Sequence, residues 1–258
     1  MKIFVTSIIL LLLAATSHAE DRVFNALRIA HAGGGILGNT YTNSYDALNL
    51  NIKNGFLYFE IDFSFTKDNK LVCIHDWEGS FKRSFGFETK ERPSLETFEF
   101  LSRNASRFNK CTLDGLADWM KEHPSAILIT DIKENNIEAL QIIATSIPDA
   151  KRRVIPQVHQ PMEFDPVKKI GFESIIWTLY KFRGTNNHVV NWVAKFSGPF
   201  AITMPEKMAR TDLPARLKNK NIPTYVHTIN DKESMKIYID KYDLTEIYTD
   251  TLQPKDLQ

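Results

Sequence analysis

The sequence predicts a single α/β domain that folds as an eight-stranded (β/α)8 barrel, or TIM barrel. Short β-branched or apolar segments alternate with amphipathic segments along the chain, a pattern typical of a parallel sheet with helices packed outside it. Eight such repeats follow the N-terminal segment, and the roughly 240 residues they occupy match the usual size of this barrel. The chain contains no internal repeat, low-complexity tract or linker, which favours one domain.

The predicted barrel strands are short runs rich in Ile, Val, Leu, Phe and Tyr. They cover residues 27–31, 57–63, 126–132, 153–158, 174–178, 198–203, 222–227 and 245–249. Helices are predicted between them at residues 43–54, 112–122, 135–146, 161–170, 186–195, 205–219 and 231–240. Helix start signals agree with two of these assignments, because Ser44 can cap the first helix and Thr112 the second.

One further run, residues 70–75, also has the composition of a strand. Only a short turn separates it from the strand that ends at Phe63, whereas a parallel crossover needs a dozen residues or more. We therefore interpret residues 64–75 as a hairpin that folds back over the second barrel strand. The connection 76–111 that follows is the longest in the chain, and loops of that length are often functional.

The N-terminal segment, residues 1–19, has the pattern of a secretory signal peptide. Lys2 precedes an apolar run from Ile3 to Ala15, and small residues at 17 and 19 suit cleavage near Ala19. The barrel would then occupy residues 20–258 and be secreted or periplasmic, although an uncleaved anchor is the alternative. Cys73 and Cys111 would be in an oxidising compartment, where they could form a disulfide or remain free.

The composition excludes some partners and identifies none. The chain is 43% hydrophobic with a formal net charge of +1, as expected for a globular enzyme, and it has no basic excess of the kind that nucleic acid binding requires. No segment indicates an obligate protein partner.

Three carboxylates are predicted to point into the barrel. Glu60 and Asp62 alternate with Phe59, Ile61 and Phe63, so the apolar side chains face the helices and the acidic ones face the barrel axis. Asp131 occupies the corresponding face of the next strand, followed by Lys133. One divalent cation, Mg²⁺ or Ca²⁺, would neutralise these oxygens. A buried network of lysine and carboxylates without metal is the alternative.

Two histidines are predicted at the same mouth of the barrel. His31 ends the first strand, before a run of three glycines that could let an anionic ligand approach the backbone or could form only a turn. His75 ends the predicted hairpin. Two imidazoles on either side of a metal-bound phosphate can divide general-base and general-acid work near neutral pH.

Taken together, these residues resemble the glycerophosphodiester phosphodiesterases, a family of (β/α)8 barrels. The resemblance runs from about Ile29 to Asp250 and is most specific in "FEIDFSFTKDNKLVCIHDW", residues 59–77. It implies a phosphoric diester hydrolase in which His31 and His75 are catalytic. It also implies that Glu60, Asp62 and Asp131 hold the metal and that Lys133 contacts the phosphate.

The chain departs from this family at three positions. Ala32 replaces an arginine, Asp131 replaces a glutamate as in the related sphingomyelinase D enzymes, and His227 replaces a tryptophan. His227 is a candidate substrate-binding or structural residue. Trp177, near Tyr180, is a candidate for the pocket wall or for the core.

Two substrate classes agree with the sequence, small glycerophosphodiesters and lysophospholipids. A lysophospholipid substrate would bring the protein into transient contact with lipid. Aromatic residues after His75, namely Trp77, Phe81, Phe85 and Phe87, could hold an acyl chain or pack the loop onto the barrel. Phospholipase or sphingomyelinase D-like action on intact lipid and an inert phosphodiester-binding barrel are the alternatives. Gln157 and His159 receive no assignment from the sequence.

Overall fold

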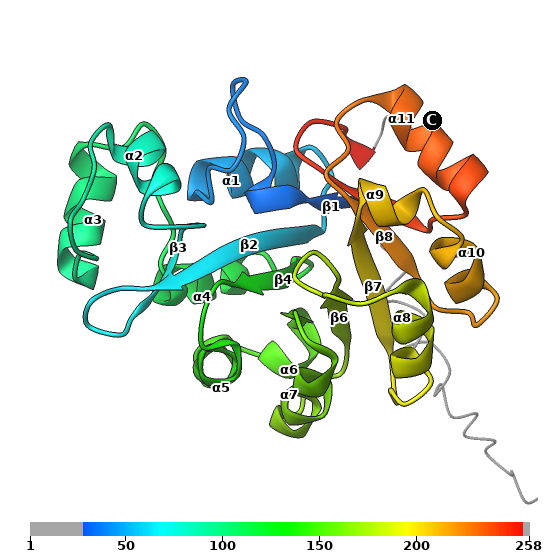
Figure 1. The fold of residues 1–258 in the computed structure, drawn as a ribbon. Coiled ribbons are helices and arrows are strands. Elements are labelled where there is room, and N and C mark those ends of the chain that lie inside the picture. The colour runs from blue at the N-terminus through cyan, green and yellow to red at the C-terminus, as the bar shows by residue number, and fades with distance from the viewer. Residues whose placement is uncertain (1–27, 255–258) are drawn as a thin grey trace, which may run out of the picture.

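Eight parallel strands close into a barrel in the computed structural model, which describes residues 28–254 (Figure 1). They are β1 (Arg28–Ala30), β2 (Tyr58–Phe65), β4 (Ile127–Ile132), β5 (Val154–Val158), β6 (Ile175–Thr178), β7 (Phe200–Pro205), β8 (Thr224–His227) and β9 (Glu246–Thr249). Because β1 pairs with both β2 and β9, the sheet has no open edge within the ring. The predicted barrel is confirmed. Leu27 and the predicted signal peptide lie outside the described residues.

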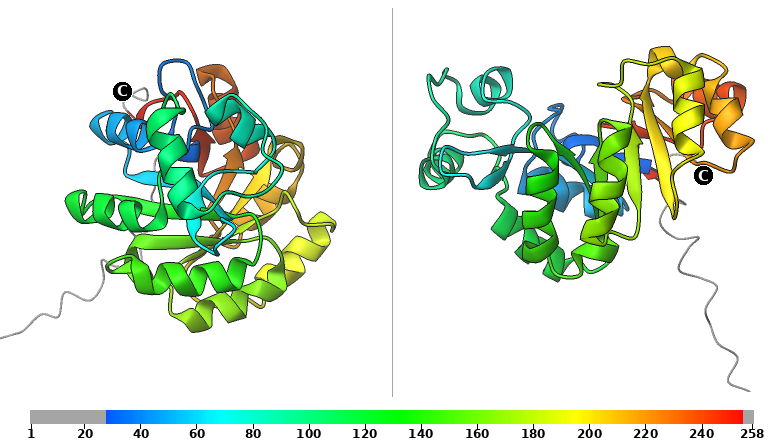
Figure 2. Two further views of the ribbon diagram at one scale, coloured as in Figure 1. Left: turned by 90° about the vertical axis from the view of Figure 1, so that its left-hand side faces the viewer. Right: turned by 60° about the horizontal axis from the view of Figure 1, so that its bottom comes forward.

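Helices follow most strands and cover the outside of the barrel (Figures 1 and 2). The α-helices around the ring are α1 (Tyr45–Lys53), α4 (Leu113–Glu122), α5 (Asn136–Ser146), α6 (Ala150–Arg153), α7 (Phe164–Ile170), α8 (Asn186–Val193), α9 (Glu206–Ala209), α10 (Leu213–Lys218) and α11 (Lys232–Lys236). Short turns η1 (His31–Gly33), η2 (Pro161–Glu163) and the π-helical η3 (Ile237–Lys241) complete them. The predicted caps form, since the side chains of Ser44 and Thr112 accept hydrogen bonds from the first turns of α1 and α4.

Each barrel strand has an apolar outer face and an inner face that becomes polar at its carboxyl end. On β2, Phe59, Ile61 and Phe63 are buried against the helices in the main core. The inner face of the barrel holds a second cluster, formed by Ile29, Ile129, Ile155, Ile176, Ala201, Tyr225 and Tyr248. Burial of one such side chain stabilises the fold by about 1.5–3 kcal/mol. This inner layer is the floor on which the polar residues lie.

The chain between β2 and α4 forms an insertion beside the barrel (Figures 1 and 2). Strand β3 (Leu71–Cys73) pairs antiparallel with β2, as the predicted hairpin requires. The long connection then contains two helices that the sequence analysis did not predict, α2 (Gly79–Phe85) and α3 (Leu95–Asn104).

Aromatic residues of the insertion form a small core of their own. Trp77, Phe81, Phe85 and Phe98 are buried together with Val72 and Ile74, whereas Phe87 is 45% exposed. Packing therefore accounts for Trp77, Phe81 and Phe85, and these side chains are not free to hold an acyl chain.

A disulfide joins the insertion to the segment before α4. Cys73 and Cys111 are bonded, with their Cα atoms 5.1 Å apart. Since Cys73 ends β3, the bond fixes the strand that leads to His75. Of the helices in residues 28–254, none is long and apolar enough to cross a membrane.

Candidate active site

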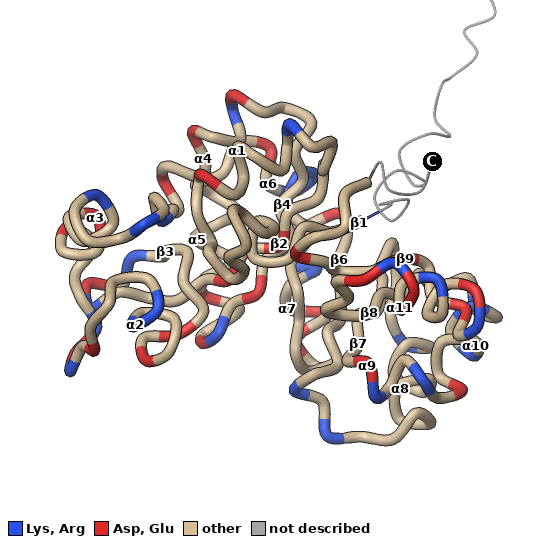
Figure 3. The backbone as a smooth tube through the Cα atoms, turned by 90° about the horizontal axis from the view of Figure 1, so that it is seen from above, with Lys and Arg blue, Asp and Glu red and all other residues tan. Residues whose placement is uncertain are grey.

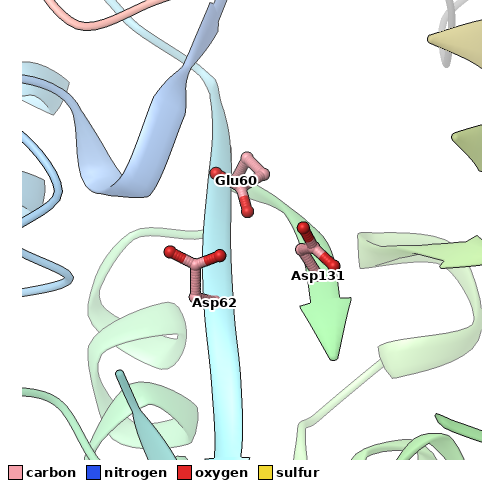
Figure 4. Close-up of side chains that lie close together, drawn as sticks. All are labelled: Glu60, Asp62 and Asp131. Carbon is pink, nitrogen blue, oxygen red and sulfur yellow. The ribbon is translucent and has the colours of Figure 1, made fainter. Parts of the chain in front are cut away.

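Three carboxylates converge at the carboxyl end of the barrel (Figure 4). Glu60 and Asp62 lie on β2, and Asp131 lies on β4 directly opposite Asp62 in the parallel register. One oxygen from each of the three groups lies within 4.8 Å of the others, and all three residues are buried. The alternation along β2 that was read from the sequence therefore brings these groups together as predicted.

The Lys133 ammonium group lies between two of these carboxylates. Its Nζ atom is 2.6 Å from Asp62 Oδ1 and 2.7 Å from Asp131 Oδ2. Although burial opposes it, the charge of Lys133 and a hydrogen bond from His159 hold the pKa of Asp131 well below its usual range. Burial and the charge of Asp62 raise the pKa of Glu60, so a single lysine does not balance three carboxylates.

These residues fit a divalent cation. The donors are carboxylate oxygens, which hard ions such as Mg²⁺ and Ca²⁺ prefer, and they are close enough together to share one ion. A bound cation would favour the ionised form of Glu60, which burial and the charge of Asp62 otherwise disfavour. Both Mg²⁺ and Ca²⁺ accept this donor set.

His31 is held by the carboxylate of Asp250, the residue that follows the last barrel strand. Its Nδ1 atom is 2.9 Å from Asp250 Oδ1, and its Nε2 atom is 4.0 Å from Glu60 Oε2. Asn230 fixes the Asp250 group, since its side chain donates to Oδ2 and accepts from the Asp250 amide. Burial alone would lower the pKa of His31, but the Asp250 hydrogen bond and the charges of Glu60 and Asp250 raise it to about 9.

His75 forms a second histidine–aspartate pair within the insertion. Its Nδ1 atom is 2.8 Å from Asp76 Oδ2, and Asp76 also accepts hydrogen bonds from the amide and hydroxyl of Ser80. Burial opposes the effect, but these hydrogen bonds hold the pKa of Asp76 well below its usual range. An ionised Asp76 accepts a hydrogen bond from the Nδ1–H group of His75, which leaves Nε2 of His75 free for proton transfer.

Both histidines and the three carboxylates line one cavity of about 240 Å³. Lys133, Gln157, Thr178, Tyr180, His227, Thr228, Tyr248 and Tyr41 complete its wall. The ring of Tyr41 contacts both imidazoles edge-on, with centroids 4.5 Å from His31 and 5.8 Å from His75. One aromatic side chain therefore spans the space between the two histidines.

Several residues in or next to the cavity were given no role, or an open one, in the sequence analysis. Nε2 of His159 and the hydroxyl of Tyr180 both contact Asp131, at 2.9 and 3.0 Å, so they orient that carboxylate. His227 lines the cavity and bonds Thr203 through Nδ1. Burial and the nearby His31 charge lower the pKa of His227 to about 4, and it is neutral at physiological pH.

Trp177 does not line the cavity, so the prediction that it forms part of the pocket wall and contacts substrate is wrong, and the alternative core position is confirmed. Its side chain is fully buried on the outer face of β6, where it packs against Phe182 and Phe196. The reason is the strand period, because Ile176 takes the inward position and Trp177 must face the helices.

The glycine run after His31 forms only a turn, and the prediction that it lets an anionic ligand approach the backbone is wrong. Gly33 and Gly34 are buried and do not line the cavity, so they offer no backbone to an anionic ligand there. Gly34 has φ +85°, and a Cβ atom on it would lie 2.4 Å from the Asn51 side chain. The run is a tight turn that lets η1 pack against α1.

The fold is shared with solved phosphodiesterases. The glycerophosphodiester phosphodiesterase of Thermotoga maritima superposes with a TM-score of 0.68 at 21% identity, over 90% of this chain and 96% of that one. A glycerophosphoryl diester phosphodiesterase of Parabacteroides distasonis gives 0.67 at 18% identity, over 88% and 83%. A phosphodiesterase of Oleispira antarctica, solved with the product sn-glycerol-3-phosphate, gives 0.68 at 15% identity, over 90% and 95%.

Sequence comparisons do not assign the chain to a family. No protein-family model matches the chain, and no curated protein matches it. At these identities the likeness establishes the architecture alone. The chain therefore has the (β/α)8 fold in which glycerophosphodiester phosphodiesterases have been solved.

Proposed function

We propose that this chain is a metal-dependent phosphoric diester hydrolase of the glycerophosphodiester phosphodiesterase family. One observation carries the proposal: two histidine–aspartate pairs, three carboxylates and one lysine surround a single small cavity. The fold shared with phosphodiesterases, one of them solved with sn-glycerol-3-phosphate, supports a small phosphodiester as substrate.

The two imidazoles divide the proton transfers. Each presents Nε2 while its Nδ1 atom is held by a carboxylate, so one ring removes the proton of the attacking hydroxyl and the other protonates the leaving oxygen. Lys133 donates to a phosphoryl oxygen and stabilises its developing charge. Glu60, Asp62 and Asp131 would hold the divalent cation, which supplies Lewis-acid stabilisation of the phosphoryl oxygens.

Hydrolysis of glycerophosphocholine, followed by phosphorus NMR, tests this proposal. We expect turnover that EDTA abolishes and that added Mg²⁺ or Ca²⁺ restores. His75→Ala should lower kcat by about 10²–10⁴, the usual contribution of an acid–base group. A protein that binds the diester but never cleaves it would favour the inert barrel, and unchanged turnover in His75→Ala would reject the assigned roles.

Export from the cytoplasm is part of the same proposal. The predicted signal peptide indicates secretion or a periplasmic location, and the Cys73–Cys111 disulfide is consistent with an oxidising compartment. Immunodetection of the processed chain in cell fractions, with N-terminal sequencing to locate cleavage near Ala19, would test it.

A further inference from the structure

A second, larger cavity adjoins the candidate active site on the far side of His75. It measures about 690 Å³ and shares only Tyr41 and His75 with the first cavity. We call it the basic cavity. Its other lining residues come from the loop before α1, the start of the insertion, α2 and the segment before α4, and they are Gly38, Asn39, Thr40, Thr42, Asp76, Arg83, Ser84, Ser106, Arg107, Phe108 and Lys110.

Positive charge dominates this lining. Arg83, Arg107 and Lys110 face the basic cavity, and within residues 28–254 none of the three forms an ion pair with a carboxylate. Arg83 donates to Ser80, and the Arg107 guanidinium lies 5.2 Å from the centre of the Phe108 ring. Basic positions along α2 and α3 are visible in Figure 3.

The one carboxylate in the lining, Asp76, forms no ion pair with these cations among the described residues. Asp76 already accepts hydrogen bonds from His75, from the amide and hydroxyl of Ser80 and from the amide of Glu78. These donors therefore occupy the oxygens of Asp76, the carboxylate that orients His75. The cationic side chains have donors to spare for an outside ligand.

Lys110 is the residue that most needs such a ligand. It is only 5% exposed, and its ammonium group donates to the carbonyl of Thr42 alone among the described residues. An ammonium group has three donors, so two have no protein acceptor. Burial and the charge of Arg83 lower the pKa of Lys110 to about 7, against the attraction of Asp62. A bound anion would raise this pKa and favour the charged form of Lys110.

We propose that the basic cavity binds a phosphate monoester carried by the substituent on the His75 side of the reacting phosphodiester. Because His75 belongs to both cavities, a substituent leaving the phosphorus on that side extends directly into the basic cavity. Two guanidinium groups and an ammonium group suit a dianion. The charged lining disfavours an acyl chain. This inference rests on the proposed function and narrows its substrate class.

The experiment compares two substrates that differ by one phosphate. Glycerophosphoglycerol and glycerophosphoglycerol phosphate are assayed with saturating Mg²⁺ at low ionic strength, and kcat/KM is measured for each. We expect the phosphorylated diester to be preferred about tenfold or more, as charge-assisted hydrogen bonds imply. Arg83→Gln and Arg107→Gln should each reduce this ratio, mainly through KM, and the double variant should bring it near one.

Lys90→Gln is the matched control. Lys90 is also an exposed cation, but it lines a different cavity beside His75 and should leave the ratio unchanged. Lys110 is kept, since its loss would release Thr42 and the loop that carries Tyr41. A wild-type ratio near one, or a ratio that survives in the double arginine variant, overturns the inference while leaving the hydrolase assignment intact.

A binding measurement separates the two proposals if neither diester is cleaved. Calorimetric titration then compares glycerol 1,3-bisphosphate with glycerol 3-phosphate. Tighter binding of the bisphosphate that disappears in the double arginine variant would support the basic cavity although the proposed function has failed. Equal affinities for both probes would overturn the inference as well.

Discussion

Asp250→Asn should weaken catalysis by releasing His31. The substitution keeps the size of the side chain, but it removes the charge that Nδ1 of His31 contacts at 2.9 Å. It also places an amide beside Asn230, whose Nδ2 atom now donates to Asp250 Oδ2 at 2.8 Å. If the side-chain oxygen of the introduced asparagine faces Asn230, its NH₂ group faces the imidazole of His31. If that oxygen faces the imidazole instead, the NH₂ group of the introduced asparagine faces the NH₂ group of Asn230. Either arrangement loses one of the contacts.

The size of the effect follows from the interaction that is lost. A hydrogen bond to a charged group contributes about 1.5–3 kcal/mol, and about 1.4 kcal/mol corresponds to a factor of ten in rate. We therefore expect kcat/KM to fall by roughly 10- to 150-fold, which is less than the loss of the imidazole itself would cause. The pKa of His31, now about 9, should fall toward its ordinary value of 6.5.

Two measurements check this reasoning. Phosphorus NMR follows hydrolysis, and nitrogen-15 NMR follows the titration of His31 in the metal-free protein. Asp240→Asn serves as a control because Asp240 is an exposed carboxylate on η3. If the variant retains wild-type kcat/KM and the same His31 pKa, Asp250 does not position this histidine. If activity falls but the pKa stays, the effect is merely structural.

Three further predictions concern the metal, pH and the disulfide. Asp131→Asn should raise the Mg²⁺ or Ca²⁺ concentration needed for half-maximal activity at least tenfold, measured by metal titration of the EDTA-treated enzyme, whereas an unchanged requirement would exclude Asp131 as a ligand. In metal-free protein, protonated His31 stabilises the fold below pH 6.5, and this contribution is lost as pH rises through about 9. The melting temperature should therefore fall between pH 6.5 and about 9, and it should fall less steeply in the His31→Gln variant than in the wild type. Equal dependence of the melting temperature on pH in the two proteins would contradict this prediction. Replacing both Cys73 and Cys111 with Ser should lower the free energy of unfolding, measured in urea, by about 4 kcal/mol. The reason is the chain entropy of the loop that the disulfide closes, whose ends are separated by 38 residues in the sequence. An unchanged free energy of unfolding would contradict this prediction.

The acidic centre of the site could be predicted because it follows from strand geometry alone. Side chains alternate along a strand, so Glu60 and Asp62 must share a face once Phe59, Ile61 and Phe63 are assigned to the core. Parallel strands with adjacent carboxyl ends then bring Asp131 beside them. The same rule, applied to β6, would have excluded Trp177 from the cavity, since Ile176 takes the inward position.

The parts of the site that could not be predicted depend on contacts between distant segments. Asp250 lies 219 residues from His31, and only the pairing of β9 with β1 makes them neighbours. An acidic residue at the end of the last strand was a signal that could have been used. Tyr41 had no such signal, because it lies in a loop with positive φ at Leu37, Tyr41 and Asn43 whose course no periodicity describes.

The two histidines proposed as acid and base belong to different structural units, and this constrains how the site can be assembled. His31 and Asp250 directly follow the barrel strands β1 and β9, whereas His75 and Asp76 follow β3 in the insertion. Asn43 connects the two units, since its side chain donates to Asp62 and its carbonyl accepts from the Cys111 amide. Closure of the barrel therefore fixes the three carboxylates proposed to hold the metal and one imidazole, while the position of the second imidazole depends on how the insertion packs. Both must be in place before a phosphodiester meets an acid and a base at once.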